Sequence, residues 1–164
     1  MKKILIAYFT KTNSTKEYAQ YIKEQLQSKE LNVDVVDLLS VENLHNYNAV
    51  IIGAPIYGMR WNEECVNFIK ANQIELKKVP TFYFFVSYVF ENGRKMWRKT
   101  ILKSMDKVSK LVKPNFIGKF NGRIEKRMPR FIEFMFGIKK ETPLNLMNYD
   151  KVDEFVNIIK ETLK

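Results

Sequence analysis

The sequence predicts an α/β domain, a three-layer sandwich around a five-stranded parallel sheet with the strand order 2-1-3-4-5. Short apolar runs alternate along the chain with longer segments that carry apolar residues at helical spacing. The runs are apolar almost throughout, as expected of strands whose two faces are both covered by helices. A chain of 164 residues suffices for one such domain. We therefore treat residues 1–164 as a single domain, with a basic, aromatic insertion at about 121–147.

Five strands and four longer helices follow one another in the chain. The first strand, at 4–9, and the third, at 49–53, are continuous apolar runs. The second, at 33–38, contains Asp34 and Asp37, which favours an edge position. Aromatic residues fill the fourth strand, at 81–86, and a fifth is expected at 116–120. Helical spacing of apolar residues predicts helices at 15–29, within 62–73, at 94–112 and at about 149–163.

The loop after the first strand is the main candidate for a ligand site. In a doubly wound sheet of this order, ligands bind at the carboxyl ends of the strands, where the strand order reverses. The loop places hydroxyl groups beside a helix N-terminus, whose unpaired N–H groups attract anions. Asn13 adopts the left-handed conformation of a tight turn more readily than most residues. We predict phosphate binding by Thr10, Lys11, Thr12, Asn13, Ser14 and Thr15. The alternative is that Ser14 or Thr15 only caps the helix.

The loops after the third and fourth strands should flank this site. Both contain large aromatic residues next to glycine, and aromatic side chains gain energy by stacking on a flat ring. The alternative is that these aromatics belong to the core or its rim. The predicted ring-binding residues are Pro55, Ile56, Tyr57, Gly58 and Trp61 in the first loop, and Ser87, Tyr88 and Asn92 in the second.

Several other classes of site are absent from the sequence. It contains neither the G-x-x-x-x-G-K-[ST] motif of nucleotide-hydrolysing proteins nor a G-x-G-x-x-G motif after the first strand. One histidine and one cysteine allow no zinc cluster of the usual kind and no internal disulfide. We assign no catalytic residue, because no Cys, His or carboxylate pair forms an acid–base apparatus. The single cysteine favours a cytoplasmic location, and no apolar stretch is long enough to span a membrane.

The three loops together resemble those of flavodoxin-fold proteins that bind FMN. The phosphate loop is matched by the T-x-T-x-x-T pattern at Thr10, Thr12 and Thr15, and the first ring loop by the sequence from Gly53 to Gly58. Tyr88 falls in the second ring loop. The resemblance implies FMN as the cofactor, with the isoalloxazine flanked by Tyr57, Trp61 and Tyr88 and the Gly58 backbone turning to meet its N5. Asn13 departs from the pattern, since flavodoxins usually have glycine there.

A second departure is the basic charge, since ordinary flavodoxins are acidic. The segment from Gly118 to Asp150 resembles in layout the menaquinone-dependent protoporphyrinogen oxidase group, which carries a basic, aromatic segment before the last helix. That resemblance implies an FMN-dependent oxidoreductase with a quinone as electron acceptor. The alternative is a flavodoxin-type electron carrier that docks on a redox protein through its basic patch.

The net charge of +10 is concentrated in residues 94–140. Residues 94–113 hold eight basic and one acidic side chain, and residues 114–140 hold seven and two. Such an excess predicts an anionic partner, either lipid head groups, nucleic acid or an acidic small molecule; the alternative is a solvated helix face. A nucleic-acid-binding module is the least favoured of these, because no recognised motif is present.

The insertion contains a short apolar segment between basic flanks. Pro129 and Gly137 fit the two ends of a helix that carries Phe131, Phe134 and other apolar residues. Such a helix can lie in a membrane interface, line a hydrophobic substrate pocket or simply cover the core. We expect Arg123, Arg127 and Arg130 to be free to bind a porphyrin propionate or a lipid phosphate. The protein would then be peripheral at the inner face of the membrane.

Overall fold

The computed structural model describes residues 1–164 and contains the predicted parallel sheet. Its strand order is β2-β1-β3-β5-β6, which confirms the predicted order of five strands and the edge position of β2. A two-residue strand, β4, pairs antiparallel with β3 and was not predicted. The strands are β1 (Lys2–Tyr8), β2 (Leu31–Asp37), β3 (Ala49–Tyr57), β4 (Arg60–Trp61), β5 (Thr81–Ser87) and β6 (Phe116–Asn121).

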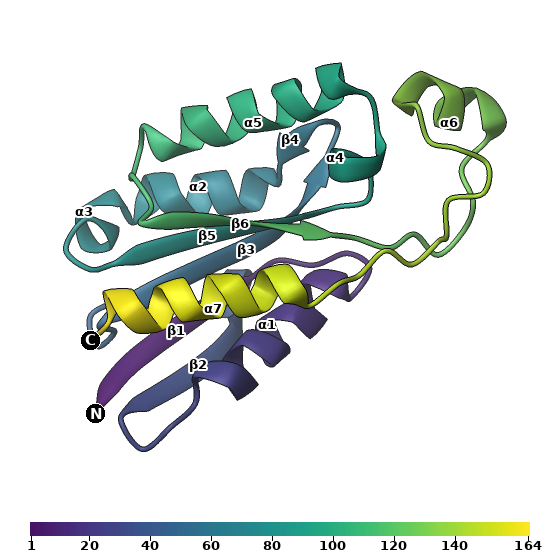
Figure 1. The fold of residues 1–164 in the computed structure, drawn as a ribbon. Coiled ribbons are helices and arrows are strands. Elements are labelled where there is room, and N and C mark those ends of the chain that lie inside the picture. Colours follow the sequence, from purple (N-terminus) through teal and green to yellow (C-terminus); the bar gives the residue numbers. More distant parts are fainter.

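Helices cover both faces of the sheet (Figure 1). One face carries α1 (Ser14–Leu26) and α7 (Asp150–Thr162), and the other α2 (Glu63–Ala71), α3 (Gln73–Leu76) and α5 (Lys95–Ser109). Three further elements are short, namely η1 (Leu38–Ser40), α4 (Val89–Asn92) and α6 (Arg130–Phe136). The helix expected within 62–73 ends at Ala71 and is followed by Asn72, whose side-chain Nδ2 donates to the Phe68 carbonyl at 2.9 Å. A side chain that binds the preceding turn in this way competes with continuation of the helix.

The strand β5 supplies the centre of the hydrophobic core on both faces. Phe82 and Phe84 pack towards α1 and α7, whereas Tyr83 and Phe85 pack towards α2 and α5. This alternation is the period of two that a strand imposes on its side chains. Gly53 of β3 is required beside Phe84, because a Cβ atom at this position would lie 2.0 Å from the phenyl ring.

The insertion leaves the sheet after β6 and returns at the start of α7 (Figure 1). Its two ends are held together by the buried Tyr18 hydroxyl, which donates to the Asn121 carbonyl at 2.7 Å and accepts from the Asn148 amide at 3.1 Å. Two backbone hydrogen bonds further along also join the outgoing and returning segments of the insertion. The Ile124 amide donates to the Leu144 carbonyl at 3.0 Å, and the Leu146 amide donates to the Gly122 carbonyl at 3.2 Å.

The helix α6 stands clear of the sheet beyond the carboxyl ends of the strands (Figure 1). Its Phe131 and Phe134 side chains are exposed, so the alternative of a core-covering helix is wrong. None of the helices combines the length and the apolar character that crossing a bilayer requires.

Candidate functional site

The loop between β1 and α1 has the backbone of an anion-binding turn. Asn13 adopts the left-handed conformation, with φ 63° and ψ −15°, as the sequence predicted. The first hydrogen bond of the helix runs from the Glu17 amide to the Asn13 carbonyl at 2.9 Å. The amides of the preceding residues are therefore left without partners inside the helix, at the positive end of its dipole.

Two hydroxyl groups of this loop are buried without a hydrogen-bond partner among the protein atoms. They are the Oγ1 atoms of Thr10 and Thr15. An unsatisfied buried hydroxyl costs about 1–3 kcal/mol, so such a pair requires an explanation. A bound phosphate supplies one, because its oxygens accept hydrogen bonds from hydroxyl and amide donors at once. Lys11 and Lys16 are exposed beside the loop and add positive charge. The residues present thus fit a phosphate group.

The Ser14 hydroxyl does not act as the helix cap that the alternative required. Asn13 occupies the N-cap position and makes no side-chain capping bond. Ser14 is buried, and its Oγ lies 3.4 Å from the Thr12 Oγ1. These two hydroxyls therefore lie together on the same loop as the unpaired ones.

The first predicted ring-binding loop is a tight hairpin between β3 and β4. Gly58 and Met59 form its turn with positive φ values of 54° and 59°. Positive φ at both central positions is typical of a type I′ turn, which matches the twist of antiparallel strands. Pro55 is buried within β3, opposite Val86 of β5.

Tyr57 is the aromatic residue that this hairpin presents at the surface, with 42% of its area exposed. The Nζ atom of Lys11 lies 4.4 Å from the centroid of the Tyr57 ring, so the phosphate loop and the hairpin are in contact. Partial burial, followed by the charge of Glu125, raises the pKa of Tyr57 above its usual value. Glu125 belongs to the insertion, whose charge thus acts on this tyrosine.

Trp61 does not lie where the sequence placed it. Only 3% of its surface is exposed, its Nε1 donates to the Ala54 carbonyl at 3.2 Å, and its ring lies 5.1 Å from that of Tyr83. Ile56, which pairs with Trp61 across the hairpin, also packs against this core. The structure therefore assigns Trp61 to the core, as the alternative had it, and its ring is not free to flank a ligand.

The second predicted loop opens with the short helix α4. Ser87 Oγ accepts from the amides of Val89 and Phe90 at 3.3 and 3.1 Å, so its side chain caps this helix. Tyr88 is buried, and its hydroxyl donates to the Pro143 carbonyl of the insertion at 3.0 Å. Asn92 is exposed at the end of α4. Among the three predicted aromatics, Tyr57 is thus the one that the structure leaves exposed.

Arg123 is bound within the protein, contrary to the expectation that it is free. Its guanidinium donates to both carboxylate oxygens of Glu17, at 2.9 and 2.5 Å. The hydrogen bond to Glu17 is also the main reason why the pKa of Arg123 lies above its usual value. Glu17 could not be recognised as this partner from the sequence, because 106 positions separate it from Arg123. The pair fastens the insertion to the first turn of α1.

Arg127 is also engaged, whereas Arg130 is not. Arg127 contacts Glu133 at 3.2 Å and donates to the Thr142 carbonyl at 2.7 Å. The expectation that Arg127 is free to bind an anion is therefore wrong. Arg130 is exposed and takes part in no ion pair.

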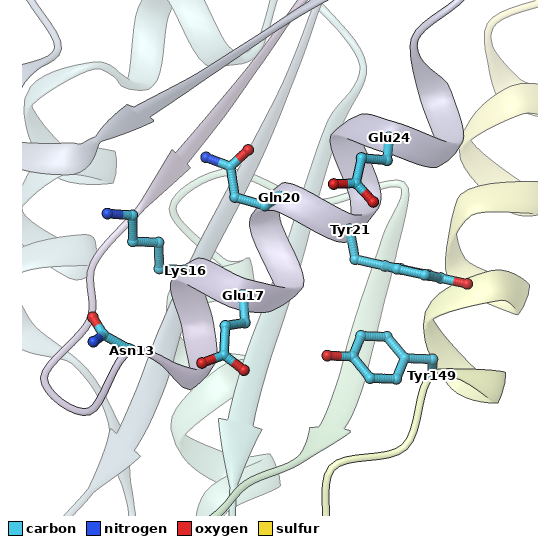
Figure 2. Close-up of a pocket in the computed structure, with 7 residues that line it drawn as sticks. All are labelled: Asn13, Lys16, Glu17, Gln20, Tyr21, Glu24 and Tyr149. Carbon is cyan, nitrogen blue, oxygen red and sulfur yellow. The ribbon is translucent and has the colours of Figure 1, made fainter.

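A shallow hollow lies along the outer side of α1 next to the phosphate loop (Figure 2). Asn13 and Lys16 line one end of it, and the rings of Tyr21 and Tyr149 lie side by side near the other. The two ring centroids are 4.6 Å apart, and the Tyr21 hydroxyl donates to Asp153 of α7 at 2.8 Å. These tyrosines therefore join α1 to α7.

Comparison with known proteins gives a family match over most of the chain. The family model described as a flavodoxin domain matches residues 5–137. Protoporphyrinogen IX dehydrogenase [quinone] of Escherichia coli strain K12 is 27% identical over 100 residues, which are 60% of this chain and 55% of that protein. The same protein from Escherichia coli O157:H7 matches equally. The chain thus spans about half the length of these relatives.

Solved structures show the same fold at low sequence identity. A short-chain flavodoxin associated with a PDU bacterial microcompartment covers all of both chains with a TM-score of 0.65 and 15% identity. The flavodoxin of Fusobacterium nucleatum, solved with flavin mononucleotide bound, also covers all of both chains, with a TM-score of 0.61 and 14% identity. An NADH:FMN oxidoreductase covers 98% of this chain and 88% of its own, with a TM-score of 0.59 and 11% identity.

Proposed function

Because the chain belongs to the flavodoxin domain family, we propose that it binds FMN in the loop between β1 and α1 and works as a flavin-dependent redox protein. The observation that carries the proposal is the pair of buried, unpartnered hydroxyls of Thr10 and Thr15 beside the left-handed Asn13. When bound, FMN supplies the electron chemistry, and the protein supplies binding, orientation and electrostatics.

The residues of the site divide this work. Thr10, Thr15 and the free amides of the first turn of α1 hold the phosphate, while Lys11 and Lys16 offset its charge. Tyr57 presents an aromatic face for the ring, and the Gly58–Met59 turn brings backbone groups to the same place. Cys65 is fully buried and its pKa lies well above the usual value because of that burial, so it has no part as a nucleophile.

For the reaction, we propose electron transfer to a quinone from a protoporphyrinogen-like donor. Support comes from the 27% identity to protoporphyrinogen IX dehydrogenase [quinone] and from the basic insertion next to the site. Each turnover removes two electrons and two protons from the donor and delivers them to one quinone, which becomes the quinol, so complete oxidation of a porphyrinogen to a porphyrin consumes three quinones. The rival proposal is an electron carrier for a protein partner, and the full mutual coverage with a short-chain flavodoxin favours it.

The first test is the absorption spectrum of the protein as isolated, followed by titration of the flavin-free protein with FMN. Absorbance bands of bound flavin, or saturable uptake of FMN, are the expected result. Absence of both would remove the proposal.

A second test distinguishes the two redox roles. The FMN-loaded protein is supplied with protoporphyrinogen and a soluble quinone, and porphyrin fluorescence is followed. Formation of porphyrin that depends on the quinone supports the dehydrogenase. No porphyrin, together with flavin reduction by a reductase, supports the carrier.

A further inference from the structure

We propose that α6, with the beginning of α5, forms a docking surface for an anionic lipid bilayer. The proposal goes beyond the redox function and does not require FMN, so the two can fail separately. It rests on the exposure of apolar side chains, on the way in which α6 is fixed, and on the charges around it.

Three apolar side chains of α6 are exposed, whereas its other two, Ile132 and Phe136, are half-buried. Phe131 is 71% exposed and Phe134 is 76% exposed, and Met135 is exposed beside them. Met96, in the first turn of α5, is exposed nearby. The helix α6 protrudes from the rest of the protein (Figure 1). Exposed apolar side chains that are gathered on such an element mark an interaction site.

The acidic side chain of the same helix points inwards, while Arg130 in its first turn is exposed. Glu133 is only 5% exposed and contacts Arg127, while the phenylalanines on either side are in solvent. An ordinary surface helix has the opposite arrangement, with its charges outside and its apolar residues inside. At Phe131, Glu133 and Phe134 the arrangement of α6 is reversed, and packing within this chain does not explain the two exposed phenylalanines.

The C-terminal end of α6 is fixed to α5 by three hydrogen bonds. The Arg94 amide donates to the Phe136 carbonyl at 2.8 Å and its guanidinium to the Phe134 carbonyl at 2.9 Å. Trp97 Nε1 donates to the Met135 carbonyl at 3.0 Å. These bonds satisfy carbonyls that a helix end leaves free, and they hold the phenylalanines outward. The surface is thus formed before any partner arrives, which lowers the entropic cost of docking.

The charges around α6 select an anionic partner. Exposed cations flank the helix on both sides in the sequence and on the adjoining turn of α5, namely Lys95, Lys126, Arg130, Lys139 and Lys140. Basic clusters of about this size, combined with an apolar element, are typical of proteins that bind anionic lipid.

The shape of the surface favours a bilayer over a protein. A stable protein interface requires roughly 800 Å² from each partner, and a protruding helix of seven residues offers little of that. In a bilayer, by contrast, two phenylalanines enter the boundary between head groups and acyl chains while the cations remain at the phosphates.

The test measures binding of the full chain to vesicles by sedimentation. Vesicles of phosphatidylcholine that contain phosphatidylglycerol should bind the protein, and high salt or pure phosphatidylcholine should weaken binding. The variant F131S/F134S should lose about tenfold in partitioning for each phenylalanine. I74S is the matched control, because Ile74 is 74% exposed on α3, at the opposite end of the molecule (Figure 1).

Charge is tested with a second pair of variants. K139E/K140E should lose at least about tenfold in binding to the anionic vesicles. K77E/K113E changes the net charge equally, and both of these lysines lie away from α6, around the hollow beside Pro80. This control should bind nearly as well as the unmodified protein.

The proposal is overturned if the unmodified protein does not bind anionic vesicles, or if each control loses as much binding as its test variant. Dimers that F131S/F134S converts to monomers, without vesicle binding, would instead show that α6 contacts a second copy of the chain. Circular dichroism verifies that each variant is folded. Unchanged FMN uptake by F131S/F134S separates this surface from the flavin site.

Discussion

Replacing Thr15 with valine distinguishes a ligand-binding hydroxyl from a purely structural one. Thr15 is fully buried, and its Oγ1 has no partner among the protein atoms. Burial of an unpaired hydroxyl costs about 1–3 kcal/mol, and valine fills nearly the same volume without that cost. In the absence of flavin, we expect T15V to be more stable than the unmodified protein by about 1–2 kcal/mol. Its Tm should rise by about 2–8 °C, measured by calorimetry.

FMN binding should change in the opposite direction. A hydrogen bond to a charged phosphate contributes about 1.5–3 kcal/mol. Its loss in T15V should weaken FMN binding by about 10–150-fold. Titration of the flavin-free protein, followed by quenching of flavin fluorescence, measures this change.

Thr81 provides the matched control. It is also buried, but its Oγ1 donates to the Leu76 carbonyl at 2.9 Å. T81V should therefore lose about 1–3 kcal/mol of stability and keep its affinity for FMN. The reasoning is refuted if T15V is less stable without flavin and still binds FMN normally, since the hydroxyl would then have a structural role.

Three further substitutions test the elements that support the site. N13G should raise the free energy of unfolding by up to about 1 kcal/mol, because glycine adopts the left-handed conformation of Asn13 without strain. Its affinity for FMN should be unchanged or improved. A marked loss of affinity in the FMN titration would reveal a role for the Asn13 side chain. Y18F should lower the free energy of unfolding by about 1–3 kcal/mol, measured by urea unfolding at neutral pH. The Asn121 carbonyl and the Asn148 amide, at the two ends of the insertion, both lose their hydrogen-bond partner in this variant. Burial raises the pKa of Tyr18 from 10.0 to about 12, so the stability that its neutral hydroxyl contributes is complete below pH 10 and is lost as the pH rises towards 12. Between pH 10 and 12 the stability of the unmodified protein relative to Y18F should therefore fall by about 2–3 kcal/mol, which removes or reverses the advantage that it has at neutral pH; a constant difference would contradict the assignment. G53A should lower the free energy of unfolding by about 3 kcal/mol, because its Cβ would lie 2.0 Å from the Phe84 ring. An unchanged urea midpoint would refute this packing argument.

The sheet was predictable because its strands are buried on both faces. A run such as Ile4–Phe9 has no polar face, and only a parallel sheet between helices accommodates several such runs. The left-handed Asn13 was predictable from its residue type and its position before a helix. The hairpin at Gly58 and Met59 was not, because methionine rarely adopts positive φ and the pair lacks the usual turn residues.

The predictions that the structure contradicts concern the direction in which side chains point and their hydrogen-bond or ion-pair partners. Trp61 and Tyr57 lie in one hairpin, but the period of two turns Trp61 and Ile56 towards the core and Tyr57 and Arg60 away from it. Composition of the loop could not reveal this alternation without the register of β4. The ion pair of Arg123 with Glu17 was equally hidden, because it depends on the path of the whole insertion.

Helix α1 joins the phosphate loop to the insertion, two features that the sequence presents as separate. Its first turn carries Thr15 and also Glu17, a carboxylate that would oppose an anion bound nearby. Arg123 of the insertion pairs with that carboxylate through both oxygens and offsets its charge. The next residue, Tyr18, holds the two ends of the insertion in place. The insertion therefore contributes to the electrostatics of the phosphate loop through an arginine that is itself fully engaged within the protein.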